Sequence, residues 1–120
     1  MASPIPTIRR GASFKAVFAE GRRYYSDLLV YVLLRRAVEP VPNDVAPLRV
    51  GYAVTKRHGG VVRRNRVRRC LREAIRVLPV RRSEPAALVL IAKREAFSAT
   101  FHALMADVEQ GFARMRLLDG

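Results

Sequence analysis

The chain has 120 residues, half of them hydrophobic, and its 23 Lys and Arg against 10 Asp and Glu give a formal net charge of +13. This length fits a single domain over residues 1–120, and the hydrophobic content excludes a disordered basic tail. Such a charge excess favours a polyanionic partner, most often a nucleic acid, with an anionic membrane as the competing choice.

Hydrophobic spacing predicts six secondary-structure elements in the order α, β, β, α, β, α. They are a helix over 13–20, strands over 28–34 and 48–55, a helix over 62–78, a strand over 87–92 and a helix over 98–117. Three prolines between residues 37 and 47 predict a loop. This order favours the α+β class and a two-layer α-β sandwich.

The first helix, SFKAVFAE, carries Phe14, Val17 and Phe18 at helical spacing and is expected to end at Gly21. Aromatic residues at this spacing are usually core anchors. The strand over 48–55, LRVGYAVT, alternates larger apolar residues with a face that is unusually small and polar. That second face consists of Arg49, Gly51, Ala53 and Thr55.

Several classes of site and location are disfavoured by the rest of the chain. Cys70 is the only cysteine, which excludes an internal disulfide and a cysteine-based metal site. Residues 1–14 lack the apolar run of a signal peptide, and the runs LLVYVLL and AALVLIA are shorter than the ~20 residues that span a bilayer. We therefore expect a cytoplasmic protein without membrane contact, with a flexible tail over residues 1–8.

The sequence KRHGGVVRRNRVRRCLREAIR, residues 56–76, contains eight Lys and Arg between Lys56 and Arg72 without one acid among them. At about 100° per residue, the helix over 62–78 has one apolar side and an opposite basic side. The apolar side comprises Val67, Cys70, Leu71, Ala74, Val77 and Leu78. Arg63 also falls on it, in the first turn, where its long side chain can reach out past the helix end.

Charge repulsion argues against a merely solvated helix face. Arg64 with Arg68, and Arg68 with Arg72, are like-charge pairs at i, i+4, and these destabilise an isolated helix. Only Glu73 offers local relief. The pattern therefore predicts a polyanion on this face, without selecting which one.

Two glycines precede this helix, and they have two interpretations. Gly59 and Gly60 permit bare backbone to approach a phosphate at a helix N-terminus, but a simple tight turn explains them equally well. Cys70, at the centre of the apolar side, is expected to be a packing residue.

The stretch GYAVTKRHGGVVRRNRVRRCLREAIR closely resembles the signature of the bacterial ribonuclease P protein component. In that signature a strand ending in Lys and Arg leads through a glycine turn to an Arg-Asn-Arg helix. The segment FKAVF with Gly21 looks like the family's first helix, and LLVYVLL and LVLIAKR look like its other strands. The resemblance thus extends across the chain.

The resemblance implies an α-β sandwich like a domain of ribosomal proteins, with a mixed sheet and a left-handed βαβ crossover. It also implies an activity: such proteins assist a catalytic RNA that removes the 5′ leader from precursor tRNA. The RNA and its Mg²⁺ ions carry out the hydrolysis, so the protein is expected to have no catalytic residue and no metal site. The implied partners are the catalytic RNA and precursor tRNA, with no obligate protein partner.

Two surfaces follow from this resemblance. The surface for the catalytic RNA comprises Lys56, Arg57, Arg64, Asn65, Arg66, Arg68, Arg69 and Arg72. The second surface is a cleft between the first helix and the sheet for the single-stranded leader, comprising Phe14, Phe18, Tyr31 and Arg49. Aromatic side chains over a basic groove stack bases with little sequence preference, as leaders of varied sequence require.

Three alternatives remain open from the residues alone. A protein-only nuclease needs clustered carboxylates or histidines, but the acids are scattered and His58 and His102 have no nearby carboxylate in sequence. A ribosomal or other structural RNA-binding protein would carry the same charge and fold. A DNA-binding helix is less favoured, because no helix-turn-helix pair precedes the basic helix.

Overall fold

A computed structural model describes residues 5–40 and 47–119. Its helices and strands are α1 (Gly11–Glu20), β1 (Arg22–Tyr25), β2 (Leu29–Leu34), β3 (Arg49–Ala53), α2 (Val61–Arg76), β4 (Ala87–Ala92) and α3 (Phe101–Arg114). Two 3-10 turns, η1 (Lys56–His58) and η2 (Arg94–Phe97), flank α2 and β4. The predicted α+β class and the order αββαβα are confirmed, with one additional strand, β1.

Strand β1 was not predicted because its sequence, RRYY, has no apolar alternation. It pairs with β2 alone and forms one edge of a sheet with the order β1-β2-β4-β3. An edge strand can be polar on both faces, so hydrophobic periodicity does not reveal it. Part of the predicted loop, residues 41–46, lies outside the described residues.

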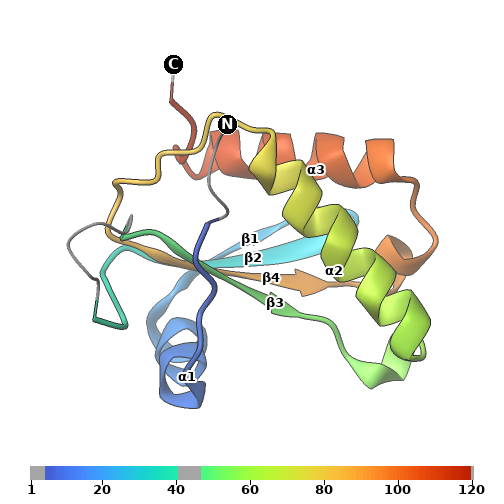
Figure 1. The fold of residues 1–120 in the computed structure, drawn as a ribbon, viewed down its shortest axis with the longest axis horizontal. Helices are drawn as coiled ribbons and strands as arrows, with labels where there is room; N and C mark the ends of the chain where they lie inside the picture. Colours follow the sequence, from blue (N-terminus) through green and yellow to red (C-terminus); the bar gives the residue numbers. More distant parts are fainter. Residues whose placement is uncertain (1–4, 41–46, 120) are drawn as a thin grey trace.

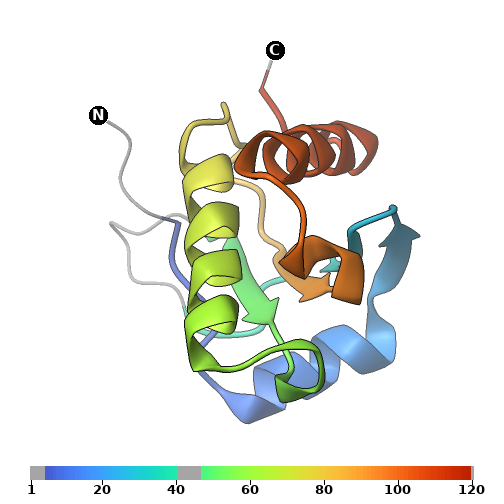
Figure 2. The same cartoon turned by 90° about the vertical axis from the view of Figure 1, so that its right-hand side faces the viewer.

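The crossover from β3 through α2 to β4 joins two adjacent parallel strands. Figures 1 and 2 together show that the chain leaves β3, passes across the face that carries α2 and returns to β4 in the left-handed sense. This is the sense that the resemblance implied, against the usual right-handed preference. It places the basic helix beside β3, the last strand in the order of the sheet.

Helices cover both faces of the sheet. Helices α2 and α3 pack on one face around the larger apolar cluster, which includes Leu71, Leu88 and Phe112. Helix α1 lies on the other face over a smaller cluster that contains Val17, Val32 and further apolar side chains. The two predicted layers are therefore extended by α1, which forms a third and partial layer.

The sheet is tied to α3 by a buried tyrosine. Tyr31 of β2 is 1% exposed, and its hydroxyl donates to Asp107 Oδ1 at 2.5 Å. The Ser26 hydroxyl donates to the same oxygen at 2.8 Å. The Tyr31 ring also packs on Gly111 of α3, where a Cβ atom would lie 2.5 Å from the ring. Burial and the bond to Asp107 raise the pKa of Tyr31 above its usual range.

The N-terminal segment lies along β3. Residues 1–8 were predicted to be a flexible tail, but Thr7 forms a parallel bridge with Val50, and Ile8 is buried. Residues 1–4 lie outside the described residues. The following turn is held by Glu39, whose carboxylate accepts the backbone N–H groups of Arg9 and Arg10 at 2.9 and 2.8 Å.

Burial alone would raise the pKa of the Glu39 carboxyl. The N–H groups of Arg10 and Arg9 and the nearby Arg49 charge outweigh that effect and lower the pKa below its usual value. This anion therefore fixes the start of α1 relative to the sheet.

Candidate nucleic-acid interface

Helix α2 is amphipathic as predicted. Its buried residues are Val67, Leu71, Ala74 and Ile75. The helix ends at Arg76, two residues earlier than the predicted Leu78, and Val77 is exposed. Cys70 was expected at the centre of the buried side but is only half-buried, at the border with α3.

The predicted basic residues form one surface, here called the α2 ridge. It consists of Lys56, Arg57, Arg64, Asn65, Arg66, Arg68, Arg69 and Arg72. Lys56, Arg57, Asn65, Arg69 and Arg72 are exposed, and the remaining three are half-buried along its two borders. Val62, 80% exposed, adds an apolar side chain at the start of the helix.

Some of these side chains have intramolecular partners and others are free for a ligand. Arg66 donates to the Ala99 carbonyl oxygen at 2.9 Å, which links α2 to the start of α3. Arg68 donates to Asn65 Oδ1 at 3.2 Å. Within the described ranges, Lys56, Arg57 and Arg69 have no hydrogen bond or ion pair. These three charges are therefore left for an external anion.

The single acid of α2 does not neutralise the ridge. Glu73 pairs with Arg76, whose Nε donates to Glu73 Oε2 at 2.9 Å. The hydrogen bond from Arg76 lowers the pKa of Glu73. Glu73 thus compensates a charge at the end of the helix and not the ridge itself.

Arg63 was predicted to reach past the helix end. Its guanidinium lies 5.8 Å from the centre of the Phe97 ring.

The two glycines before α2 differ in their surroundings. A Cβ atom on Gly59 would lie 3.0 Å from the Phe97 ring, so Gly59 is explained by close packing in a turn. A Cβ atom on Gly60, the N-cap residue of α2, would meet nothing within 4 Å. Only Gly60 therefore offers open backbone at the helix N-terminus.

A cleft lies between α1, the β3 edge and α2, here called the Phe14 cleft. It is lined by Thr7, Ile8, Phe14, Gly51, Tyr52, Arg68 and Arg72 and has a volume of about 170 Å³. The Phe14 ring lies directly on Gly51, where a Cβ atom would be 2.7 Å from it. The ring of Phe14 therefore fills the space above Gly51 on this face of β3.

The two predicted aromatic residues of α1 do form one stacked pair. The ring centres of Phe14 and Phe18 are 6.5 Å apart. Phe14 is half-buried, and Phe18 is 36% exposed. Both rings keep a surface on which a base could stack.

Tyr31 and Arg49, the other predicted cleft residues, do not line the cleft. Tyr31 faces α3 on the opposite side of the sheet. Its neighbour in β2, Val32, is the residue that faces α1. Arg49 lies on the α1 side but is buried, and its guanidinium donates to the Pro40 carbonyl oxygen at 3.3 Å. Successive strand residues point to opposite faces, so the assignment of Tyr31 was wrong by one position.

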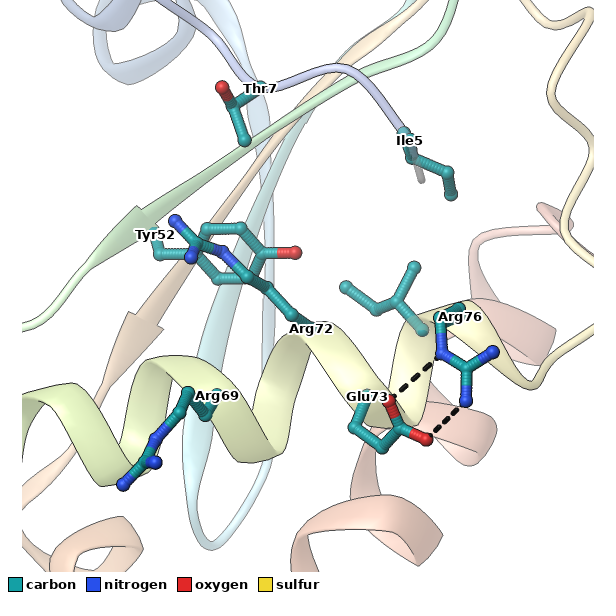
Figure 3. A pocket seen from close by; sticks show the side chains of 8 residues that line it. Ile5, Thr7, Tyr52, Arg69, Arg72, Glu73 and Arg76 are labelled. Carbon is teal, nitrogen blue, oxygen red and sulfur yellow. Dashed lines mark hydrogen bonds and ion pairs between the residues drawn. The ribbon is translucent and has the colours of Figure 1, made fainter. Parts of the chain in front are cut away.

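A larger pocket, here called the Ile5 pocket (Figure 3), shares Thr7, Tyr52 and Arg72 with the cleft. Its volume is about 600 Å³, and its lining comprises Ile5, Thr7, Tyr52, Arg69, Arg72, Glu73, Ile75 and Arg76. The Arg72 guanidinium lies 5.4 Å from the centre of the Tyr52 ring. Burial raises the pKa of Tyr52 to about 12, although the Arg72 charge acts to lower it.

Arg72 joins the ridge to the cleft, because it lines the Phe14 cleft, the Ile5 pocket and a further hollow beside Asn65. The two surfaces that were predicted separately are thus continuous. Tyr52 was missed as a site residue, since strand alternation placed it on the apolar face with Val50. Tyr52 lies between the N-terminal segment and α2, and it lines both the Phe14 cleft and the Ile5 pocket.

Among the described residues, no three His, Cys, Asp or Glu side chains come together in a group that could hold a metal ion. The donor set of this part of the chain therefore does not fit a Mg²⁺ site. No helix within the described ranges is long and apolar enough to cross a membrane.

Comparison with known proteins places these features in context. The family model described as Ribonuclease P matches residues 6–116. The ribonuclease P protein component of Gluconacetobacter diazotrophicus is 40% identical over 113 residues, covering 92% of this chain and 90% of that protein. The one from Symbiobacterium thermophilum is 35% identical, covering 88% and 87%.

Solved structures agree in fold. The RNase P protein of Staphylococcus aureus superimposes with a TM-score of 0.77 at 19% identity, covering 94% of this chain and 97% of that one. The RNase P protein of Thermotoga maritima gives a TM-score of 0.72 at 20% identity, covering 95% and 98%.

Proposed function

Because this chain belongs to the ribonuclease P protein family and is a subunit of the endoribonuclease that processes the 5′ leader of precursor tRNA, we propose that its two surfaces divide the RNA-binding work. The α2 ridge binds the catalytic RNA, and the Phe14 cleft binds the leader. The single observation that carries this proposal is the continuity of the two surfaces through Arg72.

The ridge suits a folded RNA. Lys56, Arg57 and Arg69 are exposed cations without an intramolecular partner among the described residues, and guanidinium groups bind phosphates bidentately. Neutralising phosphates releases counterions, so affinity falls steeply as salt rises. The buried apolar side of α2 holds these charges on a rigid helix.

The cleft suits a single strand. The Phe14–Phe18 pair offers aromatic faces that every base can stack on, while Arg68 and Arg72 at the cleft border attract the backbone. Stacking on an aromatic ring discriminates little between bases, because every base has a π-face. The cleft therefore accepts leaders of varied sequence.

The chemistry belongs to the RNA in this proposal. Mg²⁺ would be held by the RNA subunit and the substrate and would supply metal-assisted phosphodiester hydrolysis there, whereas the described side chains form no carboxylate cluster for it. The protein orients the substrate and neutralises phosphate charge near the reacting bond. We further infer a cytoplasmic location, where precursor tRNA is processed.

Reconstitution tests this division of labour. The purified protein is expected to cleave precursor tRNA only when a ribonuclease P RNA is supplied, and to lower the Mg²⁺ concentration which that RNA requires. The measurement is the initial cleavage rate against Mg²⁺ concentration, with RNA alone, protein alone and both. Cleavage by the protein alone, or an unchanged Mg²⁺ requirement, would contradict the proposal.

Phe18→Ala is expected to weaken the binding of leader-bearing precursor tRNA by about 10-fold or more, since base–aromatic stacking contributes roughly 1–3 kcal/mol per base. Binding of mature tRNA should not change. The measurement is the Kd of both RNAs for the reconstituted holoenzyme. Phe101→Ala, which removes a half-buried aromatic ring at the start of α3, is the matched control. An equal loss for both RNAs would remove the leader from this cleft.

A further inference from the structure

Beyond the Phe14 cleft, cationic and aromatic side chains continue along the same face onto β1. The Arg23 guanidinium lies 6.0 Å from the centre of the Phe18 ring. Arg23 and Tyr25 pair in register with Val32 and Val30, which belong to the apolar cluster under α1. Both side chains therefore share the face of the sheet that carries Phe14 and Phe18.

The course of α1 makes this surface continuous. Figure 2 shows α1 crossing beneath the sheet from the β3 side toward β1. Phe14, at the β3 end, lies on Gly51, and Phe18 follows one turn later, next to Arg23. The ring centres of Phe14 and Phe18 are 6.5 Å apart, and the Arg23 guanidinium lies 6.0 Å from the centre of the Phe18 ring. These spacings suit successive nucleotides of an unstacked strand.

The β1 end of this surface is exposed and carries a positive charge that is available to a ligand. Tyr25 is 63% exposed, which is high for an aromatic residue in a strand. Within the described ranges Arg23 pairs with no acid, and the adjacent Glu20 is already bound by Arg36 at 2.8 Å. An uncompensated guanidinium beside two aromatic rings matches single-stranded RNA, whose phosphates and bases need both groups.

We propose that Arg23 and Tyr25, which follow the Phe18 ring on the same face, form a second leader subsite that binds nucleotides farther from the cleavage site than those in the Phe14 cleft. This inference rests on the proposed leader cleft and extends it. Arg23 binds a phosphate, and Tyr25 offers its ring to the following base. The subsite therefore increases the affinity for precursor tRNA whose leader is long enough to extend beyond Phe18.

The adjacent residue provides a matched control. Arg22 has the same charge on the same strand but points to the opposite face, where its guanidinium lies 5.2 Å from the centre of the Tyr24 ring. Arg114 lies 5.6 Å from the centre of the same ring. Arg22→Ala and Arg23→Ala therefore remove equal charge from opposite faces of one edge strand.

A leader-length series tests the subsite. Kd is measured with reconstituted holoenzyme for mature tRNA, for a precursor with a short leader that ends in the Phe14 cleft, and for one with a long leader. Arg23→Ala is expected to weaken only the long-leader complex, by about 3- to 10-fold, and to reduce its log–log salt slope by about 1. Arg23→Lys should retain most of the affinity, and Arg22→Ala should change none of the three constants.

The outcomes separate this subsite from the cleft itself. If Arg23→Ala weakens the short- and long-leader complexes equally, or neither of them, the second subsite is wrong. A leader-specific effect of Phe18→Ala in the same series would leave the cleft standing. If Phe18→Ala also fails to distinguish precursor from mature tRNA, the cleft proposal falls, and the subsite that depends on it falls as well.

Discussion

Replacing Arg57 and Arg69 together by Glu is expected to weaken binding of the catalytic RNA by about 100-fold or more, because each reversal removes a phosphate contact and adds repulsion. Both side chains are exposed, and neither makes a hydrogen bond, an ion pair or an aromatic contact among the described residues. The fold should therefore be kept. The slope of the logarithm of the affinity against the logarithm of the salt concentration should decrease in magnitude by about 2 or more.

A control with the same charge change reverses two exposed arginines elsewhere, Arg81, which lies after α2 and pairs with Asp119 at 3.4 Å, and Arg116, which lies just beyond α3. Both double variants change the net charge equally, so a general charge effect would weaken them alike. The measurement is RNA titration over a range of salt, together with thermal unfolding. A parallel loss of affinity in the control, or a large loss of stability in the ridge variant, would contradict a local docking surface.

Gly111→Ala is expected to destabilise the folded protein by roughly 2 kcal/mol, against the gain of about 1 kcal/mol that Ala usually brings to a helix. The new Cβ atom would lie 2.5 Å from Tyr31 Cζ. The ring cannot move aside easily, because it is buried and its hydroxyl is bonded to Asp107 of the same helix. Thermal unfolding should show a Tm lower by several degrees.

The sign of the change decides this prediction. Gln110→Ala, at an exposed neighbouring position of α3, is the control and should shift stability by no more than about 0.5 kcal/mol. An increase in stability for Gly111→Ala would mean that Tyr31 is not fixed against α3. Leader affinity of the folded variant should not change, because Tyr31 lies on the face of the sheet opposite the Phe14 cleft.

Local patterns in the sequence were sufficient for α2 and for most of the sheet. A helix with one apolar side and one basic side can be recognised from 3.6-residue spacing alone, and its buried residues Val67, Leu71 and Ala74 follow directly. The like-charge pairs on the other side also predicted an anionic partner without any tertiary information. Strand β1 was not predicted, because an exposed edge strand need not alternate apolar and polar residues.

Tertiary structure alone decided how the binding surface is assembled. Strand alternation shows that Tyr31 and Val32 point to opposite faces, but only the packing of α1 and α3 determines which face borders the cleft. The contacts of Phe14 with Gly51, Arg72 with Tyr52 and Arg23 with Phe18 likewise join different elements. Periodicity reports only the environment of a residue relative to its own helix or strand, whereas these contacts depend on how helices and strands are placed against one another.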